Sequence, residues 1–334
     1  MSSKDSPIIN SDCIVIGGGI TGLIIATILQ RKGIKVTILD KRKYIGGRLA
    51  TRYVKQSELV AGIFDYGVQY FSVTSPQFQV WVDDWLEHGV IKEWSQGFAE
   101  GEVTSCYCGI DGVGGIAKYL AKDLDVRSRT KAINVSYEKK WLVETENEQQ
   151  YQGDMLIMTS AVPHSLSLLD ASFVPLPLDI RFSLEKIEYD RCITILALLE
   201  KPSKIPVPGG IALENNDSLA WLGDNYQKGI SPDGYAVTLH ATPRFSDYYW
   251  DSDDAEIVYK LLTAAADYLD SPVTKYQVYR WRYGLPKTSY GQPCLEFLEL
   301  PLVMAGDAFV APTVEGAVTS AIAAGELVSQ KYRV

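Results

Sequence analysis

The clearest pattern of apolar and polar positions lies in the first forty residues of the chain. A short apolar run, Cys13–Ile16, predicts a buried strand, and a longer run from Ile20 to about Arg31 predicts a helix. Gly33 ends this helix, and a second strand is expected over residues 35–39. Strand, helix and strand in this order are typical of an α/β unit with a parallel sheet.

The turn between the first strand and the helix is rich in glycine. Gly17, Gly19 and Gly22 form the pattern G-x-G-x-x-G. The first glycine permits a tight turn, the second lets a pyrophosphate approach the backbone, and the third lets the helix pack on the strand. Asp40 ends the second strand, where its carboxylate would accept hydrogen bonds from a ribose diol. We interpret this stretch as a dinucleotide site; a glycine-rich turn in an unrelated α/β unit is the alternative, and the kind of dinucleotide stays open.

Two further stretches would face the same ligand. Residues 41–48 form a basic loop that ends in Gly46, Gly47 and Arg48, and its alternative interpretation is a solvated loop. Near the end of the chain, an apolar strand over residues 302–305 leads into Gly306-Asp307, and a helix opens at Val314. The N-terminus of that helix would offer a second anion-facing site. Two such sites at opposite ends of a chain suit one long ligand.

Helical spacing of apolar residues predicts helices over residues 76–88 and 252–269. Alternation predicts strands, and these are expected over residues 64–71, 126–135, 141–146, 155–159 and 276–283. The fold class is therefore α/β, with a Rossmann-type domain and a smaller β-sheet-plus-helix domain of α+β character. The expected boundaries are 1–75, 109–165 and 290–334 for the first domain, and 76–108 and 166–289 for the second.

Composition excludes several classes of function. A chain of 334 residues with 46% hydrophobic residues can bury a large core. Its net charge of −9 and pI near 5.0 argue against nucleic-acid and anionic-membrane surfaces, which need clustered cations. Residues 1–10 lack the apolar core of a signal peptide, and no apolar run approaches the roughly 18 residues of a transmembrane helix. We therefore expect a soluble, cytoplasmic protein with no transmembrane segment and no nucleic-acid partner.

The five cysteines and three histidines show neither a disulfide framework nor a metal-ligand spacing. No metal is therefore expected. Cys106 and Cys108 would point to one face of a strand, and we interpret them as buried thiols, with a redox pair as the alternative.

In this order, the motifs resemble the FAD-dependent amine oxidase superfamily, which includes monoamine oxidase, polyamine oxidase, phytoene desaturase and renalase. The resemblance makes the Rossmann-type domain an FAD-binding domain and the second domain a substrate domain. We expect the FAD to be noncovalent, because no cysteine lies near Gly316 or Tyr70 in the sequence. The residues that the resemblance assigns to the cofactor are Gly17, Gly19, Ile20, Thr21, Gly22, Asp40, Lys41, Gly47, Arg48, Gln69, Tyr70, Thr130, Gly306, Asp307, Glu315, Gly316 and Ala317.

Within this superfamily, the renalase-like enzymes are the most similar. Residues 65–70 resemble their acid-x-Gly-x-Gln-Tyr strand, Trp281-Arg282 resembles their Trp-Arg pair, and residues 240–242 resemble a His-Thr-Thr or His-Ala-Ser strand. The catalytic residues that the resemblance implies are Tyr70, His240, Trp281 and Arg282. Arg282 and His240 would bind a carboxamide or a phosphate, and the alternative is that Trp281 and His240 are core residues.

One residue departs from the amine oxidases. Thr313 stands where those enzymes carry an aromatic residue just before Glu315-Gly316-Ala317, and this argues against simple amine oxidation. Renalase-like enzymes instead oxidise dihydropyridine isomers of NAD(P)H to NAD(P)+, with hydride transfer to flavin N5 and O2 as the electron acceptor, which yields hydrogen peroxide. The alternatives are an amine or carotenoid-type oxidase, an NAD(P)-only dehydrogenase, and a nonenzymatic escort protein that has lost its flavin.

Overall fold

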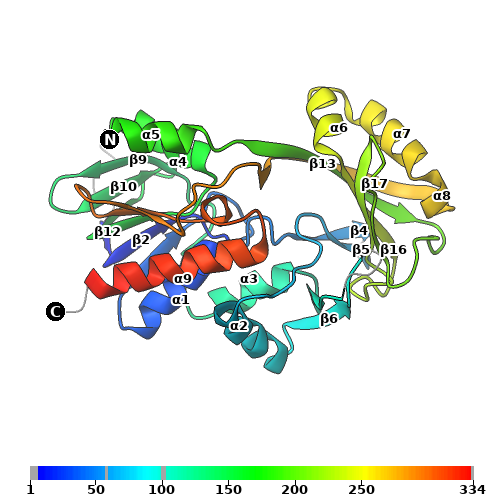
Figure 1. The fold of residues 1–334 in the computed structure, drawn as a ribbon, viewed down its shortest axis with the longest axis horizontal. Coiled ribbons are helices and arrows are strands. Elements are labelled where there is room, and N and C mark those ends of the chain that lie inside the picture. The colour runs from blue at the N-terminus through cyan, green and yellow to red at the C-terminus, as the bar shows by residue number, and fades with distance from the viewer. Residues whose placement is uncertain (1–6, 57–58, 99–102, 332–334) are drawn as a thin grey trace. The chain divides into compact units, whose positions relative to one another are not determined.

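The computed structural model describes residues 7–56, 59–98 and 103–331. The chain divides into two compact units (Figure 1): unit 1 comprises residues 1–47, 117–188 and 286–334, and unit 2 comprises residues 48–116 and 189–285. The predicted α/β class, with a Rossmann-like region and a second sheet-plus-helix region, is confirmed. The predicted boundaries of the FAD-binding and substrate domains stay a prediction, because compactness does not say which residues bind a ligand. The prediction for residues 1–10 lies partly outside the described residues.

A six-stranded sheet forms the core of unit 1. In spatial order its strands are β18 (Leu295–Phe297), β19 (Leu302–Met304), β12 (Met155–Met158), β2 (Cys13–Ile16), β3 (Val36–Leu39) and β8 (Asp125–Arg127). All neighbours pair in parallel except β18, which is antiparallel to β19. The strands β3, β12 and β19 are buried along their whole length. Such unbroken apolar strands are typical of a parallel sheet that is covered on both faces.

Helices α1 (Ile20–Arg31) and α9 (Val314–Lys331) lie side by side, as Figure 1 shows in blue and red. The Thr21 hydroxyl donates to the carbonyl of Ala317 at 3.2 Å, and Lys32 Nζ donates to the hydroxyl of Ser329 at 2.7 Å. The first bond joins the two N-terminal turns and the second joins the two C-terminal turns. The helices therefore run parallel, with both N-termini at the same end of unit 1.

The remaining elements of unit 1 form a smaller sheet and two helices. The sheet is β1 (Ile9–Asn10), β11 (Gln150–Gly153), β10 (Trp141–Thr145) and β9 (Ala132–Tyr137), and the helices are α4 (Val162–Ala171) and α5 (Leu178–Glu185). The strands predicted over residues 141–146 and 155–159 are confirmed as β10 and β12, whereas the stretch expected over residues 126–135 is split between β8 and β9. Helix α3 (Gly114–Ala121) contains a boundary between the units, and a 3-10 turn covers Asp307–Phe309.

Unit 2 is built on a five-stranded sheet. In spatial order its strands are β14 (Gly210–Ala212), β15 (Leu219–Asp224), β16 (Tyr235–Ala241), β13 (Tyr189–Leu199) and β17 (Val273–Pro286). One face is apolar, and residues such as Ile195, Leu222 and Leu239 pack there with Phe245 and Leu261. The helices on this face are α6 (Pro243–Tyr248), α7 (Asp254–Ala264) and α8 (Ala266–Leu269). Because side chains alternate along a strand, Trp221, Gly223, Thr238 and His240 point to the other face.

Two hairpins and a helix complete unit 2. They are β4 (Thr51–Gln56) with β5 (Leu59–Asp65), β6 (Ile91–Ser95) with β7 (Cys106–Gly109), and α2 (Pro76–Glu87). The helix predicted over residues 76–88 is confirmed, and the Ser75 hydroxyl caps it by accepting from the Phe78 amide. Cys106 and Cys108 are buried on β7 without forming a disulfide, on the same face of the strand as predicted.

The strand predicted over residues 64–71 is wrong, because β5 ends at Asp65. The next residues turn against the segment that follows Gly47, with the Tyr66 amide donating to the Ala50 carbonyl and the Val68 amide to the Arg48 carbonyl. A Cβ on Gly67 would lie 2.1 Å from the Arg48 carbonyl oxygen. The alternating pattern was therefore produced by a closely packed loop, which periodicity does not distinguish from a strand.

The single helix predicted over residues 252–269 is also wrong. Asp253 caps α7 by accepting from the Glu256 amide, and the helix ends at Ala264. Ala265 is the C-terminal cap of α7 and the N-terminal cap of the short α8, which stops at Asp270 in the left-handed conformation. The acidic first turn, with Asp254 and Glu256, is as expected for the helix dipole.

Candidate functional site

Four neighbouring strands of unit 1, β19, β12, β2 and β3, end in register, so their carboxyl ends lie at the same edge of the sheet. Met158 pairs with both Ile16 and Met304, and Ile16 pairs with Leu39. The residues that follow are Gly17, Asp40, Thr159 and Ala305. In open parallel sheets, ligands bind at this edge. The structure therefore brings the glycine turn, the acid and the C-terminal strand end to one side of the sheet.

The three motif glycines have different surroundings. Gly17 has a φ of 123°, and a Cβ there would lie 2.6 Å from the Thr159 hydroxyl. A Cβ on Gly22 would lie 2.1 Å from the Gly17 carbonyl oxygen. A Cβ on Gly19 would meet no described atom within 4 Å, and its φ of −78° is open to any residue. The fold itself requires Gly17 and Gly22, whereas Gly19 leaves its space to a ligand.

The N-terminus of α1 starts at this open glycine. Gly19 is the N-cap, and no side chain caps the helix. The first amides of a helix have no acceptor within the helix, and together with the dipole they favour an anion. Ile20, Thr21 and Gly22 form this first turn and are buried. The site therefore suits a pyrophosphate held by backbone amides.

Asp40 lies beside the glycine turn and is 8% exposed. Its Oδ2 accepts from the Gly18 amide and its Oδ1 from the Arg42 amide, both at 2.7 Å, while the Thr130 amide donates to the Asp40 carbonyl. A carboxylate has lone pairs beyond these two bonds, so it keeps capacity for a ribose diol. Lys41 follows it, and burial, together with the charge of Arg42, lowers the pKa of the Lys41 ammonium.

The basic loop packs against the glycine turn through its glycines. The Gly46 amide donates to the Gly18 carbonyl at 2.7 Å, and a Cβ on Gly47 would lie 3.6 Å from Gly19 Cα. Gly47 has a φ of 62°, which favours glycine. Arg48 belongs to unit 2, where its Nη1 donates to the Gly284 carbonyl at 2.9 Å. Gly47 therefore lies directly beside Gly19, and the two glycines form one backbone surface.

The C-terminal motif, Gly306-Asp307, also leaves open space beside its glycine. Gly306 has a φ of 154°, its amide donates to the Ser320 hydroxyl at 2.8 Å, and a Cβ there would meet no described atom within 4 Å. Asp307 is 8% exposed and begins the 3-10 turn. Gly19 and Gly306 thus leave open space beside the backbone at the carboxyl edge, and Gly47 packs next to Gly19, an arrangement that suits a long dinucleotide.

Thr313 has a structural role that the sequence did not indicate. Its hydroxyl accepts from the Gly316 amide at 2.9 Å, and its carbonyl accepts from the Ala317 amide. A Cβ on Gly316 would lie 2.2 Å from the Ala311 carbonyl oxygen, so the fold requires this glycine. Thr313 is therefore the N-cap of α9. The amides of Gly316 and Ala317 are therefore engaged in hydrogen bonds to Thr313. The amide of Val314, the first residue of α9, takes part in neither of these two bonds.

Unit 2 contains a buried ion pair that was not predicted from the sequence. Lys228 Nζ lies 2.7 Å from Asp65 Oδ2, and both side chains are 0% exposed. Asp65 Oδ1 accepts from the Thr51 hydroxyl and the Val113 amide, and Lys228 also donates to the Gln69 carbonyl. The pair therefore fixes both ends of the loop from Asp65 to Gln69.

Four aromatic rings of unit 2 form a compact group, which we call the aromatic cluster: Tyr70, Trp94, Phe98 and Trp221. Every pair of rings is in contact, with centroid distances from 4.7 to 6.4 Å. The Lys228 ammonium lies 4.6 Å from the centre of the Trp94 ring. Tyr70, a predicted catalytic residue, is part of this cluster.

The side chains of His240 and Trp281 form hydrogen bonds to the same backbone carbonyl, that of Tyr66. Trp281 Nε1 donates to the Tyr66 carbonyl at 3.0 Å, and the His240 ring bonds to the same oxygen. Since His240 Nε2 has no partner among the described residues, that bond uses Nδ1. Burial lowers the pKa of His240 to about 4, so the ring is neutral near pH 7 and Nε2 is an acceptor.

Arg282 is separated from this group. It is exposed, whereas its neighbour Trp281 is 9% exposed, because adjacent residues of β17 point to opposite faces of the sheet. The structure therefore brings Tyr66, His240 and Trp281 together but not Arg282, whose predicted role stays a prediction.

Several residues of these two regions were not predicted from the sequence. They are Thr159, Lys228, Trp94, Phe98 and Trp221. Thr159 carries a usable signal, because it directly follows a buried parallel strand, where ligand-facing residues occur. Lys228 carries no such signal in the sequence, because its partner Asp65 is distant in the chain.

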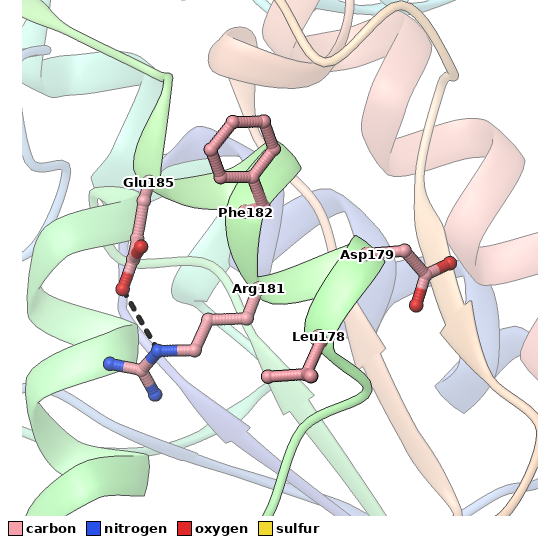
Figure 2. A pocket seen from close by; sticks show the side chains of 5 residues that line it. All are labelled: Leu178, Asp179, Arg181, Phe182 and Glu185. Carbon is pink, nitrogen blue, oxygen red and sulfur yellow. Dashed lines mark hydrogen bonds and ion pairs between the residues drawn. The ribbon is translucent and has the colours of Figure 1, made fainter.

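Helix α5 also carries a surface recess. Figure 2 shows its five lining side chains, which all come from this one helix: Leu178, Asp179, Arg181, Phe182 and Glu185. Arg181 bonds to Glu185 and to Asp170, so its guanidinium is engaged in ion pairs. The recess gives no indication of a ligand.

Within residues 7–56, 59–98 and 103–331, no cluster of side chains has the composition of a metal site. No helix in that part of the chain is both long and apolar enough to cross a membrane.

Two family models match the chain. One, described as an NAD(P)-binding Rossmann-like domain, matches residues 15–85. The other, described as flavin containing amine oxidoreductase, matches residues 89–329, which is more than half of the chain. Among curated proteins, the uncharacterized protein R656 of Acanthamoeba polyphaga mimivirus is 37% identical over 85 residues. That segment is 25% of this chain and spans only 17% of the viral protein.

Solved structures share the fold. A putative protoporphyrinogen oxidase from Exiguobacterium sp. 255-15 superposes with a TM-score of 0.73 at 12% identity, over 97% of this chain and 100% of that one. Putrescine oxidase bound to putrescine superposes with a TM-score of 0.65 at 13% identity, over the same shares. At these identities, the similarity concerns the fold alone.

Proposed function

Since the chain belongs to the family of flavin containing amine oxidoreductases, we propose that it is an oxidase that binds FAD noncovalently and oxidises dihydropyridine isomers of NAD(P)H to NAD(P)+. Family membership implies a flavin cofactor. Bound FAD supplies a hydride acceptor at N5 that O2 reoxidises, and the protein supplies position and electrostatics. The noncovalent attachment of the flavin, the substrate and the electron acceptor go beyond what family membership implies.

The residues of unit 1 fit the cofactor. The open space at Gly19 and Gly306, together with the neighbouring Gly47, would let the dinucleotide approach the backbone. The N-terminus of α1 would hold the pyrophosphate, and Asp40 would accept from the adenosine ribose. The Val314 amide and the dipole of α9 would favour the negative charge that a reduced flavin carries.

The observation that carries the substrate class is Thr313. In this chain the residue caps α9, so the position before Glu315-Gly316-Ala317 provides a helix cap instead of the aromatic wall of amine oxidases. Among the described residues of unit 2, the buried carboxylates are also engaged: Asp65 pairs with Lys228, and Asp224 accepts from Ser203. A substrate ammonium would find no free buried carboxylate there. A dihydropyridine is already a hydride donor and needs only a flat slot and neutral polar partners.

Anaerobic mixing of the purified protein with candidate substrates tests this proposal. We expect the 2- and 6-dihydro isomers of NAD(P)H to bleach the flavin absorbance rapidly, and benzylamine and spermine to leave it oxidised. Admission of O2 should then restore the absorbance and release hydrogen peroxide. Rapid reduction by benzylamine or spermine, with no reduction by the dihydropyridines, would replace the proposal by amine oxidation.

A further inference from the structure

The backbone of the loop over residues 65–69 is held by side chains from distant parts of unit 2. Three carbonyl groups of this loop, those of Asp65, Tyr66 and Gln69, accept hydrogen bonds from side chains. The donors are Thr238, Trp281, His240, Lys228 and, within the loop, the amide of Gln69. Loops ordinarily run over the surface, where water satisfies their backbone. A loop with this many side-chain partners has a fixed conformation instead.

Tyr70 directly follows this loop and is held from its other side as well. The Phe71 amide donates to the Tyr107 carbonyl at 3.1 Å, and the Tyr107 amide donates to the Phe71 carbonyl at 2.8 Å. Gln69 and Phe71 are 6% and 4% exposed, whereas Tyr70 between them is only half-buried. Tyr70 is therefore the residue of this segment with accessible surface, and its backbone is fixed on both sides.

Trp281 and His240 have no polar atom to offer to a ligand. Trp281 is 9% exposed, and the single N–H of its indole is donated to the Tyr66 carbonyl at 3.0 Å. His240 donates from Nδ1 to the same carbonyl, and its Nε2 is buried without a partner among the described residues. The polar atoms of both side chains therefore act on the loop and not on a substrate.

His240 is also connected to the aromatic cluster through the sheet. It pairs with Trp221 on the neighbouring strand β15, so the two side chains are neighbours on one face of the sheet. The centre of the Trp221 ring lies 5.3 Å from the centre of the Tyr70 ring. His240 thus bonds to the start of the loop, at Tyr66, and is a neighbour of the group of rings in which the loop ends.

We propose that His240 and Trp281 are positioning residues for Tyr70. They hold the Tyr66 carbonyl, this carbonyl fixes the loop over residues 65–69, and the loop sets the place of the Tyr70 ring, which contacts the substrate. A ring that is fixed before the substrate arrives loses little conformational freedom on binding, so the arrangement raises affinity. The substrate in question is the one named in the proposed function, on which this inference rests.

A double-mutant cycle in the holoenzyme tests whether His240 acts through Tyr70. The probe is the 6-dihydro isomer of NADH, whose Kd follows from the concentration dependence of anaerobic flavin reduction. His240→Leu removes one donor to the Tyr66 carbonyl and should raise this Kd by about three- to tenfold. In the Tyr70→Ala background, the same substitution should change the Kd by no more than about twofold, because the ring that it positions is absent.

Near-ultraviolet circular dichroism gives a second readout, in the absence of substrate. It reports the fixed packing of aromatic rings, so His240→Leu should lose part of the signal that Tyr70→Ala also removes. His240→Asn should keep both the signal and the Kd, because the Asn amide offers an N–H close to the place of Nδ1. His88→Leu is the matched control and should change neither readout. His88 Nδ1 also bonds to a backbone carbonyl, that of Asp84, but its side chain is 51% exposed.

Trp281→Phe is a second variant that acts on the same carbonyl. It removes the other donor to Tyr66 and retains an aromatic ring, so it should repeat the weaker binding and the altered spectrum of His240→Leu. Thermal midpoints show whether each variant is folded. If His240→Leu does not fold, Trp281→Phe takes its place in the cycle with Tyr70→Ala.

Three results would overturn the inference: an equal change in Kd on His240→Leu with Tyr70 and with Tyr70→Ala, an unchanged Kd in Tyr70→Ala, or an equal loss in His240→Asn and His240→Leu. The proposed function fails separately. If the isomer reduces the flavin and the two substitutions act additively, the oxidase proposal stands and the positioning role falls. If the isomer does not reduce the wild-type flavin, the oxidase proposal falls, and an unaltered spectrum of His240→Leu would then overturn the positioning role.

Discussion

A Lys228→Met variant is expected to lose about 3 to 5 kcal/mol of unfolding free energy, because it leaves the Asp65 carboxylate buried without its counter-charge. Both side chains are 0% exposed and their charged atoms are 2.7 Å apart. The Thr51 hydroxyl and the Val113 amide would still donate to Asp65, but neither brings a positive charge. The Gln69 carbonyl would also lose its bond from Lys228. We therefore expect the loop from Asp65 to Tyr70 to loosen.

Urea denaturation measures this loss, and the chain offers a matched control. Lys204 and Asp270 are also 2.7 Å apart, but their side chains are 67% and 56% exposed. Lys204→Met should change the unfolding free energy by no more than about 1 kcal/mol. A second substitution, Asp65→Leu, should restore part of the stability lost in Lys228→Met by removing the orphaned charge. Equal effects of Lys228→Met and Lys204→Met would contradict this role of the buried pair.

Gly19→Val should leave the apoprotein folded and strongly weaken flavin binding. The backbone at Gly19 has a φ of −78°, and a Cβ there meets no described atom within 4 Å, so the folded chain tolerates a side chain. A valine would fill the space through which the pyrophosphate reaches the first amides of α1. Loss of several charge-assisted hydrogen bonds should lower the flavin affinity on the order of a hundredfold or more.

Gly115→Val is the control for this variant. Gly115 is also a glycine whose Cβ would meet no described atom within 4 Å, and it lies in α3. The variant should keep a stoichiometric amount of flavin, measured as the ratio of flavin to protein absorbance after gel filtration. Full retention of flavin by Gly19→Val would show that the glycine turn does not contact the cofactor.

The sequence predicted the start of the fold well because the relevant signals are local. An apolar strand, a helix of regular spacing and glycines at fixed offsets lie within residues 13–40, and the structure has them as β2, α1 and β3. The spacing of the three glycines also indicates a separate role for each, since the tight turn, the approach of a ligand and the packing of the helix place different demands on them. The last strand and α9 were predicted on the same local basis.

Long-range contacts explain most of what the sequence did not predict. Lys228 and Asp65 are 163 positions apart, and no periodicity connects them. The loop after Asp65 alternates like a strand, but its hydrogen bonds go to the segment around Ala50. The separation of Trp281 from Arg282 is different, because the alternation of a predicted strand already places neighbours on opposite faces. The sequence therefore already indicates that the side chains of Trp281 and Arg282 point to different faces of the sheet.

The absorption spectrum of the purified protein, before and after acid precipitation, tests most directly the central claim that unit 1 binds FAD without a covalent bond. We predict a yellow protein whose flavin passes entirely into the acid supernatant and is identified there as FAD. A colourless protein that does not take up added FAD would contradict the claim, and so would a flavin that stays with the precipitate.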